Sequence, residues 1–354
     1  MVNDDWGPKR DCRLLTEFGP VGAALAAAML TAIFTGVVRW LALSRSILDH
    51  PNERSAHTAP TPRGGGLAVV VVVASWLTLA GFAGIAEWKF VAGVGGGSVA
   101  VAAIGWLDDL RSLSANVRLA CHFLAATWTV WCLGGMPSLS LGYTNAHLGI
   151  AGAVLAVVGL VWMTNLFNFM DGIDGIAGVE ALSIGAFGGG LLLVSGAPVL
   201  ATLSLVTAGA AFGFLLWNWS PARIFLGDVG SGFLGFVFGS LAIASENAQR
   251  LPVMIWAILA AAFIVDATIT FGRRLRRGYW RHAHRTHAYQ RAVQSGRSHA
   301  IVSGGVAGLN VLLGAIAIVT FQGHVPLLLG VTLAFALVIA VYMVVEKAKP
   351  FTLE

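Results

Sequence analysis

Long apolar segments without charged residues dominate the chain. No Asp, Glu, Lys or Arg occurs at positions 119–170, 181–222 or 298–345. A membrane-spanning helix needs about 20 largely apolar residues, so each segment is long enough for two spans. Glycine and proline near the middle of each segment indicate a turn between the two spans. The pattern therefore predicts an all-α, polytopic integral membrane protein.

The complete pattern predicts about eleven transmembrane helices. They are expected near residues 20–42, 64–85, 88–106, 117–134, 147–167, 175–195, 198–217, 229–245, 251–271, 300–321 and 325–345. A single transmembrane catalytic domain would then cover 20–345, between a short extracytoplasmic tail, 1–19, and a cytoplasmic tail, 346–354. The polar tail and the long first span favour an uncleaved helix over a secretory signal.

The composition supports this class of protein. Hydrophobic residues make up 57% of the chain and charged residues only 11%, and the mean hydropathy is +0.78. An ordinary soluble chain carries about 25% charged residues. The composition therefore excludes a disordered chain, a coiled coil and a disulfide scaffold, and it argues against a soluble enzyme. The three cysteines match no metal-ligand spacing.

The few basic residues indicate an orientation. With eleven spans, alternate loops face opposite sides of the membrane, and cytoplasmic loops carry the excess of Lys and Arg. If the loop at 43–63 is cytoplasmic, 17 of the 22 Lys and Arg residues fall on the inner face. The net charge of +5 is therefore interpreted as a topology signal and a local anion site, and no nucleic-acid partner is expected.

Five acidic residues fall on the same predicted face. They are Asp108, Asp109, Asp171, Asp174 and Asp228. They lie among Gly, Asn and apolar residues without a nearby Lys for each, and burial of unpaired carboxylates is costly. A cation shared by the five carboxylates would explain why they occur together. For any single one of them, the alternative is a solvated position at the end of a loop. Oxygen ligands without His or Cys favour Mg²⁺, with Mn²⁺ as the second choice.

The neighbouring residues suit a phosphate ligand. Asn165 and Asn168 share a helix face because they are three residues apart. Two Asp-Gly steps follow them, and glycine allows a ligand to approach the backbone closely. Asp228 is expected to open a helix, where backbone N–H groups can meet a phosphate.

A basic loop is predicted at 273–297, where eight Arg occur together with histidines. Planar guanidinium groups suit a diphosphate. For Arg273, Arg274, Arg276 and Arg277, a topogenic or lipid-binding role is an equal alternative. Asp266, within the preceding span, is expected to be a buried helper or a partner for a loop arginine. Carboxylates and arginines on one membrane face together suggest a reaction between a water-soluble diphosphate and a lipid phosphate.

Five motifs in this order resemble the polyprenyl-phosphate N-acetylhexosamine-1-phosphate transferase family, also called glycosyltransferase family 4. They are PNERSAHTAPTPRGGG at 51–66, GWLDDLRSLSANVRL at 105–119, NLFNFMDGIDGIAG at 165–178, NWSPARIFLGDVGSGFLG at 218–235 and HRTHAYQR at 284–291. The resemblance is greatest to undecaprenyl-phosphate GlcNAc-1-phosphate transferases that initiate O-antigen or other surface polysaccharides. Tyr289 and Gln290 stand where related enzymes have further histidine.

The resemblance implies a role for each matching residue. Asp228 would be the principal Mg²⁺ ligand, with Asp171 beside it, and Asp108 and Asp109 would be the catalytic pair. The nucleotide site would be lined by Asn168, Asp171, Asp174, Asn218 and the region of Gly172, with Phe225 stacked on the uracil. His284, Arg285 and His287 would contact the diphosphate or the sugar.

The resemblance also implies a reaction. Undecaprenyl phosphate would attack a UDP-N-acetylhexosamine directly and release UMP, on the cytoplasmic face of the inner membrane. A two-step route through an aspartyl-phosphate on Asp108 or Asp109 is the mechanistic alternative. A phospho-MurNAc-pentapeptide translocase activity is the alternative within the family, and a secondary transporter of a phosphorylated solute is the alternative outside it. A homodimer is expected only by analogy with the family.

Overall fold

The computed structural model describes residues 19–45, 48–49, 60–279 and 285–352. Its elements are α2 (Gly19–Ser44), β1 (Leu48–Asp49), β2 (Thr61–Pro62), α3 (Gly66–Phe82), α4 (Trp88–Phe90), the π-helical turn η1 (Val91–Gly95), α5 (Gly96–Arg111), α6 (Ala115–Cys132), β3 (Ser138–Ser140), β4 (Asn145–His147), α7 (Ile150–Phe169), α8 (Ile176–Val194), α9 (Pro198–Asn218), α10 (Asp228–Asn247), α11 (Val253–Leu259), α12 (Ala261–Arg276), α13 (Ala288–Gln294), α14 (His299–Phe321) and α15 (Leu327–Ala348).

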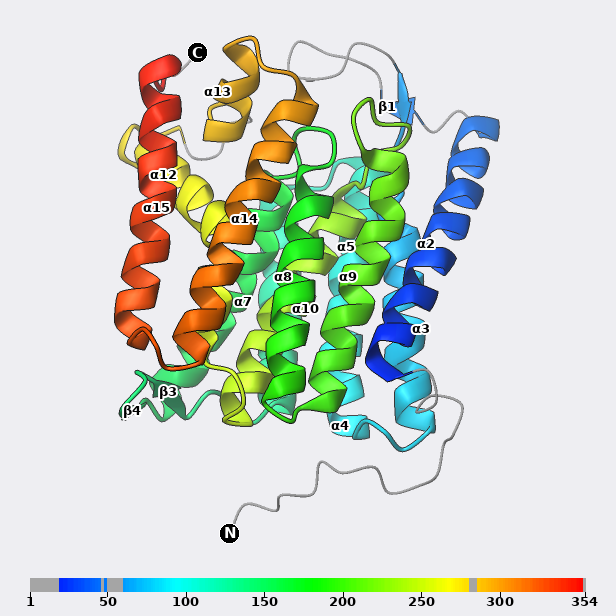
Figure 1. The fold of residues 1–354 in the computed structure, drawn as a ribbon. Helices are drawn as coiled ribbons and strands as arrows, with labels where there is room; N and C mark the ends of the chain where they lie inside the picture. Colours follow the sequence, from blue (N-terminus) through cyan, green and yellow to red (C-terminus); the bar gives the residue numbers. More distant parts are fainter. Residues whose placement is uncertain (1–18, 46–47, 50–59, 280–284, 353–354) are drawn as a thin grey trace.

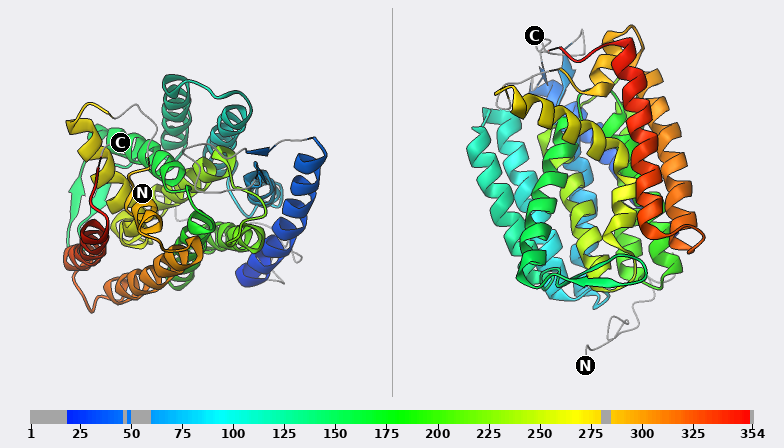
Figure 2. Two further views of the ribbon diagram at one scale, coloured as in Figure 1. Left: turned by 90° about the horizontal axis from the view of Figure 1, so that it is seen from above. Right: turned by 90° about the vertical axis from the view of Figure 1, so that its left-hand side faces the viewer.

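The long helices form one bundle (Figures 1 and 2). The short antiparallel pair β1–β2 and the helix α13 lie at one end of it, and the pair β3–β4 and α4 lie at the other (Figure 1). Helix α10 is the centre of the packing, because it is almost wholly buried and contacts α3, α5, α6, α7, α8, α9 and α11. Its first residue, Asp228, is therefore held among several neighbouring helices.

The expectation of an all-α, polytopic membrane protein is confirmed. Among the described residues, eight helices are long and apolar enough to cross a membrane, or nine if α11 and α12 form one span. Helix α3 matches a predicted span but has only 17 residues. Helix α6 matches another, but it carries Arg118 and His122 and does not meet the same hydropathy criterion. The count of eleven is therefore not confirmed.

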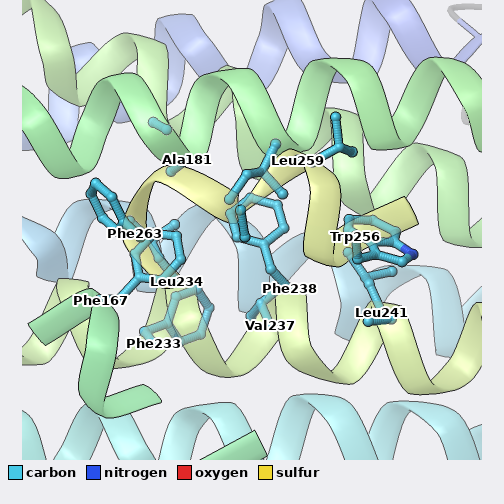
Figure 3. Close-up of a cluster of buried hydrophobic side chains, with 14 of the residues drawn as sticks. Phe167, Ala181, Phe233, Leu234, Val237, Phe238, Leu241, Trp256, Leu259 and Phe263 are labelled. Atoms are coloured by element: carbon cyan, nitrogen blue, oxygen red, sulfur yellow. The ribbon is translucent and has the colours of Figure 1, made fainter. Parts of the chain in front are cut away.

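The span expected at 251–271 is not one continuous helix, because the chain bends there by 80° between α11 and α12. Apolar residues continue through the bend, so the hydropathy pattern contains no break. Aromatic packing holds both arms: the rings of Trp256 and Phe238 lie 6.4 Å apart, and those of Phe263 and Phe167 lie 5.2 Å apart. Figure 3 shows these side chains around the bend, together with Leu259.

Two glycines let neighbouring helices reach the start of α10. A Cβ atom at Gly66, the first residue of α3, would collide with the backbone of Gly230. A Cβ atom at Gly105, in the last two turns of α5, would collide with the backbone carbonyl of Asp228. Helix backbones can pack this closely only where a side chain is missing. The glycines therefore position the start of α10 against α3 and α5.

Candidate active site

Three carboxylates and two arginines meet at the start of α10. Arg63, before α3, binds Asp109 through Nε at 2.9 Å and Asp228 through Nη2 at 3.3 Å. Arg118, in the first turn of α6, binds Asp228 through Nη1 at 3.0 Å. The same Nη1 group binds Asp108. The two arginines thus hold Asp228 from opposite sides, one through each carboxylate oxygen, and connect it to both members of the Asp-Asp motif.

The carboxylate of Asp109 caps the N-terminus of α10. Its Oδ1 accepts the backbone N–H of Asp228 at 3.1 Å, and its Oδ2 accepts that of Val229 at 3.2 Å. These N–H groups lie in the first turn of a helix, where they have no partner within the helix. The side chain of Asp109 is only 4% exposed, whereas that of Asp228 is 16% exposed. A ligand therefore has better access to Asp228 than to Asp109.

Asp108 joins the end of α5 to the start of α6. Its Oδ1 accepts the backbone N–H of Leu113 at 2.6 Å, and its Oδ2 accepts the bond from Arg118. Ser112, between the two helices, adopts a left-handed conformation with φ of 48°. The Asp-Asp motif therefore ends one helix, fixes the turn and places Arg118 beside Asp228.

Backbone hydrogen bonds fix the chain on the other side of α10. The N–H of Phe225 donates to the carbonyl of Pro62 at 2.8 Å, and the N–H of Gly65 donates to the carbonyl of Phe225 at 2.9 Å. Gly66 donates to Leu226 in the same way, at 2.9 Å. The motif that contains Arg63 thus pairs with the motif that contains Asp228, although 165 residues separate the two side chains.

Asp171 adds a fourth carboxyl group to this cluster. Desolvation and the nearby charge of Asp228 raise the pKa of Asp171 well above its ordinary value, and Asp109 and Asp174 act in the same direction. Arg63 opposes the shift. Four carboxylates, those of Asp108, Asp109, Asp171 and Asp228, therefore lie close to only two guanidinium groups. The surplus of negative charge suits a divalent cation.

The acidic residues of this cluster fit one of two types of Mg²⁺ site. No group of three or more His, Cys, Asp or Glu residues arranged to hold a metal occurs in the described part of the chain. A site made only of protein ligands is therefore not formed there. Mg²⁺ typically keeps several waters and binds one or two carboxylates together with substrate phosphates. Asp228 and Asp171 fit this second type of site.

Asn218 and Asp174 hold loops together. Asn218 accepts a hydrogen bond from the N–H of Gly175 at 2.9 Å and donates one to the carbonyl of Ile224 at 2.9 Å, and it is only 3% exposed. Asp174 accepts the N–H of Ala222 at 3.1 Å and lies 3.3 Å from His299 Nδ1. These contacts join the loop after α7 to the loop before α10 and leave little of either side chain for a nucleotide.

A pocket opens beside Asp228, between α5, α6, α7 and α10. It is lined by Ile104, Gly105, Arg118, His122, Asn165, Asn168, Phe169, Asp228 and Gly232. Asn168, predicted to line the nucleotide site, borders this pocket and lies 3.5 Å from Ser231 Oγ. Asn165 donates to the carbonyl of Val161 at 2.7 Å and lies 3.5 Å from His122 Nδ1. The pocket is thus polar on the α6 and α7 sides.

The basic loop packs beside this region through α13. Asp266 accepts the backbone N–H groups of Ala288 and Tyr289 at 2.9 and 3.2 Å, and it lies 3.3 Å from His287 Nδ1. His287 is 4% exposed and stacks on Phe169, with ring centroids 6.3 Å apart. Asp266 is therefore buried, and it fixes the start of α13 and the position of His287.

The other residues of this loop divide into two groups. Arg273 and Arg291 both bind Glu346 Oε2, at 2.7 and 2.8 Å, which ties α12 and α13 to the end of α15. These two arginines are structural. Arg285 lies among the described residues, and its backbone carbonyl accepts a hydrogen bond from Gln294 Nε2 at 2.9 Å. His284 lies outside the described residues.

From the sequence, Arg63 and Arg118 were interpreted only as topology signals, and no role was predicted for His122. A local sequence feature nevertheless marks each of these residues. Arg63 directly precedes three glycines, and Arg118 and His122 are polar residues four apart in a predicted span, hence on one helix face. Phe225 is half-buried and lies in the loop just before Asp228. Its backbone is fixed by the hydrogen bonds to Pro62 and Gly65, which place it at the edge of the site.

The sequence comparisons cover the segments that form this site. The profile of Glycosyl transferase family 4 matches residues 91–246, which include both the Asp-Asp motif and Asp228. The chain is 31% identical to a decaprenyl-phosphate N-acetylglucosaminephosphotransferase of Mycolicibacterium smegmatis, over 94% of this chain and 90% of the relative. A probable undecaprenyl-phosphate N-acetylglucosaminyl 1-phosphate transferase of Bacillus subtilis is 28% identical, over 94% of this chain and 95% of the relative.

A phospho-N-acetylmuramoyl-pentapeptide-transferase of Thermosynechococcus vestitus is 30% identical over 71% of this chain and 69% of the relative. The match to the mycobacterial relative extends over nearly the whole of both chains, so it covers the membrane frame as well as the motifs. The chain therefore belongs to glycosyl transferase family 4, the family of membrane phosphotransferases that its five motifs resemble.

Proposed function

We propose that this protein transfers N-acetylhexosamine 1-phosphate from a UDP-sugar to a polyprenyl phosphate and releases UMP, in a reaction that requires Mg²⁺. UDP-GlcNAc is the first candidate donor, because relatives that match over nearly their whole length are named for N-acetylglucosamine. Those relatives are named for decaprenyl and undecaprenyl carriers, which supports a long polyprenyl phosphate as the acceptor.

One observation carries the proposal. Asp108, Asp109 and Asp228 meet Arg63 and Arg118 at one end of a membrane bundle, in contacts of 2.5 to 3.3 Å that join three separate segments of the chain. Such a cluster binds both a cation and phosphate oxygens, which is what phosphoryl transfer requires. Its place at the end of the helices also allows a lipid acceptor to arrive from the bilayer.

Asp228 and Asp171 would hold the Mg²⁺, which would neutralise charge on the diphosphate and on the UMP that leaves. Arg63 lies between Asp109 and Asp228, so its guanidinium group is placed to bind a phosphate oxygen near these carboxylates. Arg285, His284 and His287 are proposed to approach the diphosphate or the sugar from the basic loop. Phe225 and the region of Gly172 are proposed to contact the uracil.

Direct attack is the mechanism that the geometry favours. An oxygen of the lipid phosphate forms a bond to the sugar-linked phosphorus, and the bond from that phosphorus to the UMP oxygen breaks. A covalent route through Asp109 is disfavoured, because both oxygens of that carboxylate accept backbone N–H groups of α10 and the side chain is almost fully buried. Positioning and charge neutralisation would supply most of the rate enhancement.

The proposed site lies on the cytoplasmic face of the inner membrane. The predicted orientation places 17 of the 22 Lys and Arg residues on that face, together with the Asp-Asp motif and Asp228. The proposed reaction is the first membrane step in the synthesis of a surface polymer, such as O-antigen or a cell-wall polymer. Its donor would therefore come from the cytoplasmic pool of UDP-sugars.

The direct test uses purified protein with undecaprenyl phosphate, Mg²⁺ and a panel of UDP-N-acetylhexosamines, and it measures UMP. UDP-GlcNAc is expected to give UMP and a lipid-linked sugar, and EDTA is expected to stop the reaction until Mg²⁺ is added in excess. UDP-MurNAc-pentapeptide in the same panel tests the translocase alternative. Failure of every donor to give UMP would reject the proposed function.

Asp228→Asn tests the site itself. The substitution keeps the size of the side chain but removes the charge that faces both arginines, so UMP release is expected to fall by about a thousandfold or more. The thermal unfolding curve in detergent serves as the control for folding. Near-normal release of UMP by a folded Asp228→Asn variant would exclude Asp228 from the metal site.

A further inference from the structure

We propose that Tyr289 of α13 is a positioning residue for the reaction: its hydroxyl group packs against Gly172 and thereby holds the preceding residue, Asp171, in place. Asp171 is the proposed metal ligand beside Asp228. The inference rests on the proposed function, because it explains how one ligand of that site keeps its position. It also connects the basic loop mechanically to the loop that follows α7.

Tyr289 is itself firmly anchored. The residue is only 4% exposed, and its backbone N–H donates to Asp266 Oδ2 at 3.2 Å. The N–H of Ala288 donates to Oδ1 of the same carboxylate at 2.9 Å. The ring of Tyr289 stacks on that of His287, with centroids 5.7 Å apart and 22° between the ring planes. The tyrosine side chain is therefore a rigid support with a fixed direction.

The hydroxyl group of Tyr289 contacts the loop after α7 at two points. It donates a hydrogen bond to the backbone carbonyl of Phe169, the last residue of α7, at 3.0 Å. It also lies against the backbone of Gly172, because a Cβ atom built there would collide with the hydroxyl oxygen and lie 3.1 Å from Cζ of the ring. Tyr289 thus contacts the chain on both sides of Asp171, and only glycine fits at position 172.

Other contacts fix the far half of the same loop. The carbonyl of Asp174 accepts a hydrogen bond from the hydroxyl of Ser303 at 2.7 Å. This anchor lies three residues beyond Asp171 in sequence. The backbone N–H of Asp171 itself donates to the carbonyl of Asn168 at 3.4 Å, which is long for a hydrogen bond. The contacts of Tyr289 are therefore the close restraint on the half of the loop that carries Asp171.

Asp171 needs such a restraint because like charges surround it. The charges of Asp228 and Asp109 both act on its carboxyl group. Carboxylates close together repel each other, so a loop without support would relax in the direction that separates Asp171 from Asp228. Partners that hold a ligand in place typically determine how well the ligand set binds its ion. Loss of the Tyr289 contact would therefore weaken the binding of Mg²⁺.

The first test removes only the hydroxyl oxygen. In Tyr289→Phe, the Mg²⁺ concentration for half-maximal UMP release is expected to rise by about fivefold, which corresponds to the loss of one hydrogen bond. The KM for undecaprenyl phosphate is expected to change by less than about twofold. Tyr143→Phe is the matched control, because Tyr143 is 88% exposed and lies between β3 and β4, at the opposite end of the bundle from α13 (Figure 1).

The second test uses the close approach of Gly172. Gly172→Ala is expected to lower UMP release by more than about tenfold, because its methyl group collides with the tyrosine hydroxyl. Addition of Tyr289→Phe removes the colliding oxygen, so the double variant is expected to be several times more active than Gly172→Ala alone. Gly159→Ala in α7 is the control, since no heavy atom lies within 4 Å of a Cβ atom there, and it is expected to keep normal activity.

Thermal unfolding in detergent examines the same contact without turnover. Mg²⁺ added at a fixed concentration of UMP is expected to raise the Tm of the unsubstituted protein. The midpoint of this titration is expected at about fivefold higher Mg²⁺ for Tyr289→Phe. Without either ligand, Gly172→Ala is expected to have a lower Tm, and the double variant is expected to recover part of the loss.

Three results would overturn the inference: an unchanged Mg²⁺ requirement of Tyr289→Phe, an equal rise in its Mg²⁺ requirement and its KM for the acceptor, or a double variant no more active than Gly172→Ala. Failure of the proposed function is distinct from these, because the unsubstituted protein itself would then release no UMP. The Tm of the double variant relative to that of Gly172→Ala would even then show whether Tyr289 restrains the loop.

Discussion

Asp109 and Asp228 face each other across the first turn of α10, and the carboxylate of Asp109 accepts the backbone N–H of Asp228 at 3.1 Å. It also accepts the next N–H, of Val229, at 3.2 Å. The two carboxylates therefore have different uses. Asp109 binds the helix backbone, whereas Asp228 directs its carboxylate to Arg63 and Arg118. One acidic residue thus positions the other.

Removal of the cap is expected to lower stability as well as activity. In Asp109→Ala, two N–H groups at the start of α10 and one contact of Arg63 lose their acceptor, and loss of a helix cap costs about 1–2 kcal/mol. We expect a lower Tm in detergent together with loss of UMP release. Asp228→Asn is the matched comparison, because it is expected to lose activity with a smaller change in Tm. An unchanged Tm for Asp109→Ala would show that the cap adds no stability.

Close packing of α5 against α10 is expected to matter for activity. A methyl group at Gly105 would overlap the backbone carbonyl of Asp228, so Gly105→Ala must shift the start of α10 or the end of α5. A displacement of about 1 Å can lower a rate by about a hundredfold. We therefore expect a large fall in kcat for UMP release.

Gly304→Ala is the control for this prediction, because no heavy atom lies within 4 Å of a Cβ atom built at Gly304. It makes the same chemical change in another long helix, α14, and is expected to keep normal kcat and Tm. Equal activity of the two variants would mean that the packing at Gly105 does not position Asp228.

The sequence identified where the carboxylates gather but not what each one binds. Five Asp residues on one face predicted a shared cation, yet Asp109 caps α10 and Asp174 holds a loop. Buried acidic residues elsewhere act in the same way: Glu246 accepts the N–H of Val253 at 2.6 Å, and Asp266 accepts that of Ala288 at 2.9 Å. A cap supplied from a distant segment leaves no local pattern, so only the structure reveals it.

The helical frame was predictable because the bilayer imposes it. Backbone groups in lipid must be satisfied within a helix, so hydropathy alone locates most of the spans. The bend between α11 and α12 was not predictable, because apolar residues continue through it. Arg118 was missed for another reason: an arginine near the inner end of a span is equally consistent with a topology signal and a binding site, and only its contacts with Asp108 and Asp228 distinguish them.

A buried polar pair inside the bundle offers a third prediction. Asn310 of α14 donates to Glu180 of α8 at 2.8 Å, and both residues are almost completely buried. Glu180→Leu leaves the Asn310 amide without this partner, which costs about 1–3 kcal/mol. We expect a lower Tm in detergent for Glu180→Leu, and a Tm near that of the unsubstituted protein for Glu180→Gln, which keeps an acceptor oxygen.

The double variant Glu180→Leu with Asn310→Leu completes this experiment. Replacement of both partners removes the unsatisfied amide, so the double variant is expected to be more stable than the sum of the two single changes predicts. Strict additivity of the three Tm changes would mean that the hydrogen bond does not contribute to stability.

The loop carboxylate Asp174 predicts a pH dependence of stability. Burial alone would raise the pKa of Asp174, but hydrogen bonds from His299, from the N–H of Ala222 and from Ser220 outweigh it and hold the pKa below its ordinary value of 3.8. A carboxyl group whose pKa is lower in the folded protein binds protons more weakly there than in the unfolded chain. Its contribution to the free energy of unfolding is therefore complete above pH 3.8 and is lost as the pH falls through the lowered pKa.

Asp174→Asn removes this contribution, so the Tm of the variant should lie below that of the unsubstituted protein at neutral pH. Below about pH 4 the difference should begin to narrow, because Asp174 then takes up a proton more readily in the unfolded chain than in the folded protein. Thermal unfolding from pH 7 down to pH 3 in one detergent measures both curves. A difference in Tm that stays constant over this range would show that the charge of Asp174 adds no stability. Acidification removes that charge but leaves the hydrogen-bonding groups in place.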